Sequence, residues 1–259
     1  MPARARGLTL GSVLLERSLQ PQFVSNTYLV AAEPGGDGVL IDAGGPMQPL
    51  YEAVDKNNLN VTHLLLTHHH HDHVSEAAEV KTRYGCEVVA HPIEAELIGG
   101  GLVDRTIEPG TVIESGGLSF EALHTPGHTA GMISFRTPDA VFTGDTLFKG
   151  SVGGVRAPGA SGFADLKHSI MDVLMELPPE TIIYPGHTDS TSVAQEWDEN
   201  AFIRLWRGLD SEGSESCTVW GDEATLVLWA PDYDGGHKAW VRWTDGRDDI
   251  VPGSQVERG

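Results

Sequence analysis

Short apolar segments separated by turn-forming residues dominate the first part of the chain. Apolar runs at residues 24–30 and 38–41 flank Pro34-Gly35-Gly36-Asp37, and this spacing predicts a β-hairpin. Residues 61–66 form a continuous apolar run bounded by polar residues, which is typical of a strand covered on both faces. The second and third runs lead directly into polar turns, at residues 42–45 and 67–73, so we expect functional side chains where strands end.

Helical spacing alternates with further strand patterns. Leu50 and Val54 share one face of a helix expected at residues 46–56, and Gly85 closes a second helix that starts near residue 74. The clearest helical pattern ends at Pro178-Pro179. The expected helices after Gly85 are residues 163–177 and 193–207, and the expected strands after residue 66 are 87–90, 118–123, 132–142 and 181–184. This alternation predicts a layered α/β domain.

The tail has a different pattern. Residues 209–216 are polar and read as a linker, and the runs at 225–229 and 238–243 flank Asp234-Gly235-Gly236. We therefore expect a catalytic domain at residues 1–208 and a C-terminal extension at 209–259, packed as a tryptophan-rich β-hairpin.

Composition narrows the function classes. Lysine and arginine number 17 against 37 aspartate and glutamate, and the net charge of −20 disfavours a nucleic-acid partner. No apolar run reaches the roughly 18 residues of a membrane span, and Met1 to Gly11 has no apolar stretch typical of a secretion signal. We expect a cytoplasmic protein with no membrane partner, in which Cys86 and Cys217 are reduced, buried thiols and not nucleophiles.

The strongest chemical signal is a loop rich in histidine. His68, His70, Asp72 and His73 follow a predicted buried strand, where side chains two apart can converge on one ion. Imidazole nitrogen and carboxylate oxygen suit zinc and, less selectively, iron or manganese. A purification tag would sit at a terminus and carry no aspartate, so we interpret this loop as a metal site.

Three more candidate ligands stand at the ends of later strands: His128, Asp145 and His187. The turn Pro126-Gly127-His128-Thr129 recurs as Pro185-Gly186-His187-Thr188, and we expect the two turns to face a common site. The remaining histidines are interpreted as structural: His63, His69, His71, His91, His124, His168 and His237.

Over roughly its first 208 residues, the chain resembles the metallo-β-lactamase superfamily in its His-x-His-x-Asp-His motif, its later ligands and Asp42 after the second strand. The resemblance implies a four-layer αββα sandwich with two metals at one sheet edge. It implies that Asp145 bridges the metals and that Asp42 hydrogen-bonds the ligand loop. The implied ligands are His68, His70 and His128 for one metal, and Asp72, His73 and His187 for the other.

Two divalent ions about 3.5–4 Å apart can share a water and lower its pKa toward about 7, which makes hydroxide available at neutral pH. We expect this hydroxide to be the nucleophile, with two divalent ions, most simply Zn²⁺, as cofactors. Asp72 and Asp145 are the expected catalytic carboxylates, and Asp72 is a candidate for relaying the proton.

Within the superfamily, residues 144–148 look most like hydroxyacylglutathione hydrolase (glyoxalase II), which cleaves thioesters of small thiols. Residues 151–156 depart from that family's glycine-cysteine-glycine-basic loop, and the tail replaces its C-terminal helices. The substrate is thus expected to be a small-molecule thioester or related ester whose thiol is left open. Arg156 and Phe148 are the candidate substrate-binding residues, with Arg156 as the grip for an anionic group.

Other activities use the same ligands. A persulfide dioxygenase, which resembles glyoxalase II but uses a single iron and oxygen, is the alternative that the ligands alone leave open. A lactonase is ranked lower, because quorum-signal lactonases place a tyrosine where this chain has Phe148. The negative charge disfavours a ribonuclease, and the complete ligand set disfavours a non-catalytic binding protein.

Overall fold

A computed structural model describes residues 13–259, which form two compact units. The first unit holds the described residues up to His124 together with Ile133–Phe142, and the second holds Thr125–Met132 together with Thr143–Gly259. The predicted lack of a secretion signal concerns residues 1–11, which lie outside the described residues. Within residues 13–259, no helix is both long enough and apolar enough to cross a membrane.

The first unit contains two sheets and four helices among its described residues. Its strands are β1 (Leu14–Leu19), β2 (Asn26–Ala31), β3 (Asp37–Ile41), β4 (Asn60–Leu65), β5 (Glu87–Ala90), β6 (Arg105–Thr106), β7 (Val112–Ser115), β8 (Leu118–His124), β9 (Ile133–Arg136) and β10 (Ala140–Gly144), whose last two residues belong to the second unit. Its helices are α1 (Gln48–Asn57), α2 (His71–Val74), α3 (Ala77–Tyr84) and α4 (Pro92–Ile98).

The first sheet has the order β1-β2-β3-β4-β5-β6, and it brings two strand ends together. The predicted hairpin is confirmed by the antiparallel pairing of β2 with β3, whereas β3 and β4 are parallel, with Ile41 opposite Leu65. Because parallel strands end at the same edge, Asp42 follows β3 directly beside the end of β4, and its N–H donates to the Leu65 carbonyl at 2.9 Å. The two polar turns predicted from sequence are thus neighbours.

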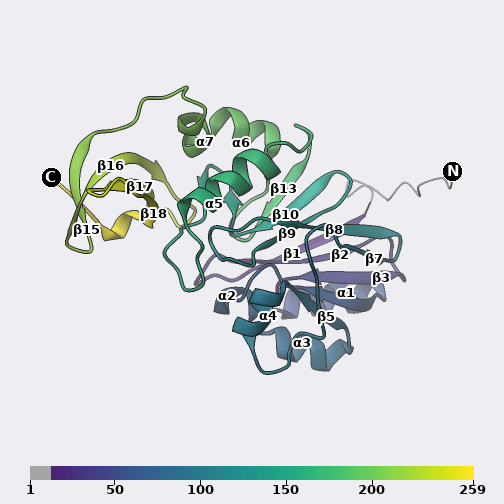
Figure 1. The fold of residues 1–259 in the computed structure, drawn as a ribbon. Helices are drawn as coiled ribbons and strands as arrows, with labels where there is room; N and C mark the ends of the chain where they lie inside the picture. The colour runs from purple at the N-terminus through teal and green to yellow at the C-terminus, as the bar shows by residue number, and fades with distance from the viewer. Residues whose placement is uncertain (1–12) are drawn as a thin grey trace. The chain divides into compact units, whose positions relative to one another are not determined.

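Helices α1 and α3 cover one face of this sheet (Figure 1). Leu50 and Val54 of α1 and Val80 of α3 are buried in one core cluster with the sheet residues Leu64 and Val88. This burial explains the helical spacing in the sequence, since an amphipathic helix is stabilised mainly by packing its apolar face.

The second sheet of this unit contains the antiparallel strands β7 to β10. The rings of Tyr28 on β2 and Phe142 on β10 meet edge to face, with centroids 5.2 Å apart. The prediction of one strand at residues 132–142 was wrong: β9 and β10 form a hairpin, closed by the Thr137 N–H donating to the Ala140 carbonyl. The reason is Pro138, which lacks the N–H that a continuous ladder needs.

The second unit contains short strands, helices and a C-terminal sheet. Its strands are β11 (Leu147–Phe148), β12 (Ser151–Val152), β13 (Ile182–Pro185), β14 (Thr191–Ser192), β15 (Glu215–Val219), β16 (Asp222–Pro231), β17 (His237–Trp243), β18 (Asp248–Pro252) and β19 (Val256–Arg258). Its helices are α5 (Phe163–His168), a π-helix (Ser169–Leu174), α6 (Val193–Glu199), α7 (Ala201–Trp206) and a 3₁₀ turn (Gly253–Gln255).

Two long helices predicted from sequence are each divided in this unit. The pattern at residues 163–177 begins as α5 and widens into the π-helix, and the pattern at 193–207 is interrupted at Asn200. Asn200 has extended backbone angles, and its side chain accepts hydrogen bonds from the N–H groups of Phe202 and Ile203. It therefore ends α6 and caps α7, because a side-chain amide satisfies the first amides of a helix.

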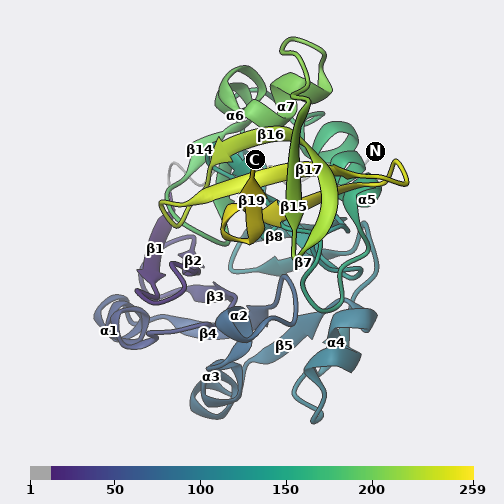
Figure 2. The same ribbon diagram turned by 90° about the vertical axis from the view of Figure 1, so that its left-hand side faces the viewer.

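The predicted C-terminal hairpin is confirmed as β16 and β17, but it lies within a larger sheet of order β18-β17-β16-β15-β19 (Figure 2). The predicted linker is shorter than expected, since β15 starts at Glu215. Trp240 of β17 packs against Phe163 of α5, with ring centroids 5.0 Å apart. The mixed α/β class is confirmed, whereas the domain boundary at residues 208 and 209 stays a prediction.

Candidate metal centre

The backbone of Asp42 has a conformation that few residues other than glycine adopt. Its φ of 59° lies in the left-handed region, which aspartate tolerates better than most residues because its short side chain bonds locally. Gly44, two residues later, lies against α2, and a Cβ there would be 1.6 Å from the carbonyl oxygen of Asp72. Only glycine fits this approach. The turn after β3 therefore places Asp42 next to the histidine-rich loop at residues 67–73.

The Asp42 carboxylate organises two histidines through hydrogen bonds. One oxygen accepts the Thr67 N–H at 2.8 Å, and the other accepts the Thr67 hydroxyl at 2.9 Å and lies 2.9 Å from Nδ1 of His73. A hydroxyl has one proton, so Thr67 Oγ1 must accept from Nδ1 of His68, 2.9 Å away. Both neutral rings thus carry the proton on Nδ1 and the lone pair on Nε2, the form that binds a metal.

The other members of the loop divide into two groups. The rings of His70 and His73 lie 4.7 and 4.3 Å from the ring of His68. His69 turns to α4 instead, where Oε2 of the buried Glu94 lies 2.9 Å from its backbone nitrogen and 2.5 Å from Nδ1. His71 is exposed. In the first unit the structure thus gathers His68, His70 and His73 and separates the two histidines interpreted as structural.

The second unit contains a matching arrangement around Asp145. Nε2 of His128 lies 3.4 Å and Nε2 of His187 lies 3.1 Å from Oδ2 of Asp145. Nδ1 of His128 donates to the Gly154 carbonyl at 2.8 Å, and a carbonyl can only accept, so the neutral ring again has its lone pair on Nε2. All three residues are buried.

The repeated Pro-Gly-His-Thr turns account for this convergence. Both deliver their histidine to the same carboxylate oxygen, as the sequence echo predicts. Gly186 is required because a Cβ there would lie 2.2 Å from Oδ1 of Asp145. Thr188, directly after the second histidine, has a φ of 62°, which is strained for a β-branched residue. Such strain is typical of positions that the surrounding structure holds for function.

The donor chemistry in each unit fits a cation. A carboxylate oxygen and an imidazole lone pair repel one another at close range, yet Oδ2 of Asp72 lies 3.4 Å from Nε2 of His73, and Oδ2 of Asp145 lies equally close to Nε2 of His128. A bound cation would turn this repulsion into attraction. The donors are nitrogen and oxygen only, and burial raises the pKa of both the Cys86 and Cys217 thiols. Both cysteines are buried, as predicted.

Aromatic side chains enclose His187. Phe148 is 1% exposed and meets the imidazole edge to face, with ring centroids 5.3 Å apart. The Tyr233 ring stacks on the same imidazole, with ring centroids 4.1 Å apart and an interplanar angle of 16°. Sequence reasoning missed Tyr233, because its place in a hairpin turn predicts only a turn. Thr67 and Gly154 were also missed, since hydroxyl and carbonyl acceptors have no sequence signature.

Arg156, the candidate grip for an anion, lies on the loop after β12. Its side chain is 46% exposed and pairs with Asp249 of β18 at 3.4 Å. Its guanidinium lies 5.6 Å from the ring centroid of Trp220 and 6.0 Å from that of Trp243. Arg156 and Arg247 line a cavity of about 570 Å³. A second arginine and an acidic partner thus accompany the proposed grip.

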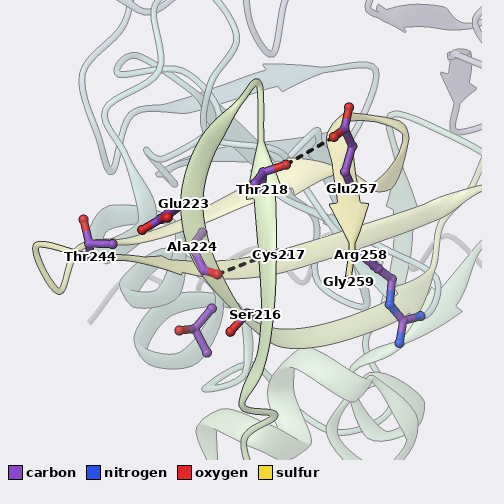
Figure 3. A pocket seen from close by; sticks show the side chains of 10 residues that line it. Ser216, Cys217, Thr218, Glu223, Ala224, Thr244, Glu257, Arg258 and Gly259 are labelled. Carbon is purple, nitrogen blue, oxygen red and sulfur yellow. Dashed lines mark hydrogen bonds between the residues drawn. The ribbon is translucent and has the colours of Figure 1, made fainter.

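A separate hollow of about 550 Å³ lies on the C-terminal sheet (Figure 3). Cys217, Thr218 and Glu223 are among its lining residues. No histidine lines it, and the Cys217 thiol is 3.5 Å from the carbonyl of Ala224. This hollow therefore offers no donor set comparable with the clusters around Asp42 and Asp145.

The remaining histidines have local partners. His91 caps α4, because its Nδ1 accepts the Ile93 N–H, and its ring stacks on His124 at 5.0 Å. His63 lies 3.4 Å from Glu87, and His168 lies 2.8 Å from Asp172. The ring of His237 stacks on that of Trp229 at 4.8 Å.

Comparison with known proteins places these clusters in a family. A family model described as the metallo-β-lactamase superfamily matches residues 21–187. An uncharacterized protein of Mycobacterium tuberculosis is 37% identical over 207 residues, covering 69% of this chain and 92% of that protein. Hydroxyacylglutathione hydrolase GloC of Haemophilus influenzae is 32% identical over 186 residues, covering 64% and 87% of the two chains.

Solved structures of other proteins also resemble this chain. ETHE1 from Myxococcus xanthus is 29% identical with a TM-score of 0.66, over 76% of this chain and 91% of that one. TTHA1623, crystallised in a di-iron-bound form, is 34% identical with a TM-score of 0.63, over 72% and 99%. The chain therefore belongs to the metallo-β-lactamase superfamily.

Proposed function

We propose that this chain is a dinuclear metal-dependent hydrolase that cleaves a small acyl thioester. The observation that carries the proposal is the convergence of two imidazole nitrogens on one carboxylate oxygen of Asp145. Support also comes from two relatives named hydroxyacylglutathione hydrolase, GloC of Haemophilus influenzae and a 38% identical protein of Rhodopseudomonas palustris. Membership of this family, with such clusters of histidine and aspartate, implies divalent metal ions.

We assign the seven donors to two ions as the resemblance implies. His68, His70 and His128 would hold one ion, Asp72, His73 and His187 would hold the other, and Asp145 would bridge them. The proposal is supported by the hydrogen bonds on the Nδ1 side of His68, His73 and His128, which direct each lone pair to Nε2. Zinc is the simplest choice of metal for nitrogen and oxygen donors, and iron and manganese also accept them.

Two divalent ions at these donors would supply Lewis acidity toward the thioester carbonyl and lower the pKa of water toward about 7. The chain's own residues then have distinct tasks. Asp42 and Thr67 keep the histidine rings in one tautomer and orientation. Asp72, whose side chain is 19% exposed, is the carboxylate placed to hold a proton at Oδ2 during attack.

The substrate contacts extend this proposal. Arg156 is half exposed and lines a cavity, which suits an anionic group on the thiol portion of the substrate. Its partner Asp249 would have to yield part of that ion pair on binding. Phe148 is proposed to shape the site from behind His187, against which it packs. A cytoplasmic location and the absence of a nucleic-acid partner stay predictions.

An iron-dependent persulfide dioxygenase is the second candidate. The 34% identical TTHA1623 was crystallised with two irons, which favours testing iron as well as zinc in this chain. The ligand residues alone do not distinguish the reactions, because histidine and aspartate bind both metals.

One experiment tests the assignment. Protein purified without added metal is analysed for bound metals, stripped with a chelator, and assayed anaerobically on a panel of small thioesters after zinc is restored. We expect about two ions per chain and zinc-dependent hydrolysis without oxygen. His71→Ala, which changes an exposed histidine of the same loop, is the matched control and should keep both ions and activity. Iron-dependent oxygen uptake with a thiol persulfide, without thioester hydrolysis, would favour the second candidate.

A further inference from the structure

We propose that Tyr233, in the turn between β16 and β17, is a positioning residue for His187, so that the C-terminal sheet is part of the metal site. The inference rests on the proposed function in one respect, the role of His187 as a ligand. Tyr233 lies outside the residues that the family model matches, which end at 187.

Two aromatic rings fix the orientation of the His187 imidazole. The Tyr233 ring lies nearly parallel to the imidazole of His187, at 4.1 Å and 16°, while Phe148 meets the same imidazole at 86°. The Cβ–Cγ bond of histidine has a broad torsional preference, so an imidazole without neighbours samples many ring planes. One parallel ring and one perpendicular ring together restrict that rotation. They hold Nε2 of His187 at 3.1 Å from Oδ2 of Asp145.

The turn carrying Tyr233 is itself anchored. Asp232 accepts hydrogen bonds from the Ser151 hydroxyl at 2.8 Å and from the Tyr233 N–H at 2.9 Å. Its other oxygen lies 2.9 Å from Nζ of Lys238, and both side chains of this ion pair are less than a tenth exposed. Removing one member of a buried pair leaves an uncompensated charge, so the pair holds the turn in one place.

The anchor connects to the chain around Asp145. Ser151 belongs to β12, which pairs with β11 two residues after Asp145, and the Ser151 carbonyl accepts from Nδ2 of Asn200 at 3.2 Å. The ε-ammonium of Lys238 also lies 5.3 Å from the Tyr233 ring centroid, within the range of a cation–π contact. Asp232 therefore links Tyr233 to Ser151, and the pairing of β12 with β11 joins Ser151 to the segment that directly follows Asp145.

A ring that positions a ligand should affect metal binding in a characteristic way. Groups that orient a metal ligand through contacts behind it commonly change metal affinity by about 10–100-fold when removed. The Tyr233 ring stacks on His187, which would hold one of the two ions, so its loss should weaken that ion more than the other. A merely structural role would lower stability without this asymmetry.

The test uses the full chain and the metal alone. Zn²⁺ affinities are measured by competition with a chelating dye for the wild type and for Tyr233→Phe, Tyr233→Leu and Tyr233→Ala. Co²⁺ loading is followed by visible absorption, and unfolding in urea is measured in parallel. We expect the leucine and alanine variants to bind one ion at least about tenfold more weakly, with an altered Co²⁺ spectrum. The phenylalanine variant keeps the ring and should match the wild type.

Trp229→Ala is the matched control, because Trp229 lies on the same sheet and stacks on His237, which is not a proposed ligand. It should keep both affinities even if it lowers stability. Equal affinities in the wild type and all three Tyr233 variants would overturn the role of Tyr233 while leaving the proposed hydrolase intact. Equal weakening in the Trp229 variant would show that the sheet acts through stability alone. Absence of metal binding by the wild type would overturn both proposals.

Discussion

His73 and Asp42 are joined by a 2.9 Å contact between Nδ1 and Oδ2, and this contact decides which imidazole nitrogen faces Asp72. The same device recurs at His128, where the acceptor is the Gly154 carbonyl. In both cases an acceptor on one side of the ring sets the donor atom on the other. The protein therefore sets the tautomer of these two proposed ligands before any ion binds.

Replacing Asp42 should weaken metal binding without removing a ligand. Asp42→Asn keeps a residue that tolerates the left-handed φ of 59°, but its amide has only one acceptor oxygen, so it cannot accept the Thr67 N–H at one atom and the His73 Nδ1–H at the other as the carboxylate does. We expect a loss of about 10–100-fold in zinc affinity or activity, measured by dye competition and turnover. Asp42→Ala should lose at least as much. Wild-type affinity in both variants would reduce Asp42 to a turn residue.

Asp145→Ala should have the larger effect. A carboxylate shared by two ions serves both, so its removal is expected to lower the occupancy of both and abolish most hydrolysis. Metal content by mass spectrometry and thioester turnover are the measurements. Asp249→Ala, which also removes a carboxylate of the second unit, should retain both ions. Two retained ions with full activity in Asp145→Ala would refute the bridging role.

Arg156→Ala should raise the Michaelis constant for an anionic thioester more than for a neutral one of similar size, because a charged grip acts mainly in uniform binding. The turnover number should change little. Asp249→Asn removes the partner at 3.4 Å and should leave the anionic substrate bound at least as tightly. Equal changes for both substrates in the Arg156 variant would indicate packing against Trp220 and Trp243 instead.

Acid should weaken helix α4 through His91. Burial, and secondarily His124, lower the pKa of His91 below its ordinary value of 6.5. The folded state thus favours the neutral ring, whose Nδ1 accepts the Ile93 N–H. This contribution is fully present above pH 6.5 and is lost as the pH falls through the lowered pKa.

The variant His91→Asn keeps a capping acceptor that does not titrate. Its unfolding free energy should fall less than that of the wild type between neutral and mildly acidic pH, by up to about 1 kcal/mol, the typical worth of an N-cap. Urea unfolding of metal-free protein measures this and excludes metal release as the cause. Parallel pH curves for the two proteins would contradict the role of His91.

The features that the sequence predicted well are local. The hairpin of β2 and β3, the buried strand β4 and the loop that follows it are encoded by residues close together in the chain. Apolar periodicity and ligand spacing are patterns within a few residues, so they can be recognised in the sequence without a structure. The repeat of Pro-Gly-His-Thr also correctly indicated that His128 and His187 face a common group.

The predictions that failed involve the ends and interruptions of elements. The single strand at residues 132–142 is a hairpin, and the helix at 193–207 is two helices joined at Asn200. An apolar run looks the same whether it continues or turns back at Pro138. The choice depends on pairing partners and capping bonds that the pattern of apolar residues does not contain.

The sequence by itself determined the family, the candidate donors and the mixed α/β class, because ligand chemistry and apolar periodicity are properties of short segments. Only the tertiary structure decided which groups orient those donors. Thr67 links Asp42 to His68 across 25 residues of chain, and Tyr233 reaches His187 from the C-terminal sheet. Such contacts depend on strand pairing and packing between distant segments, so no local sequence pattern predicts them.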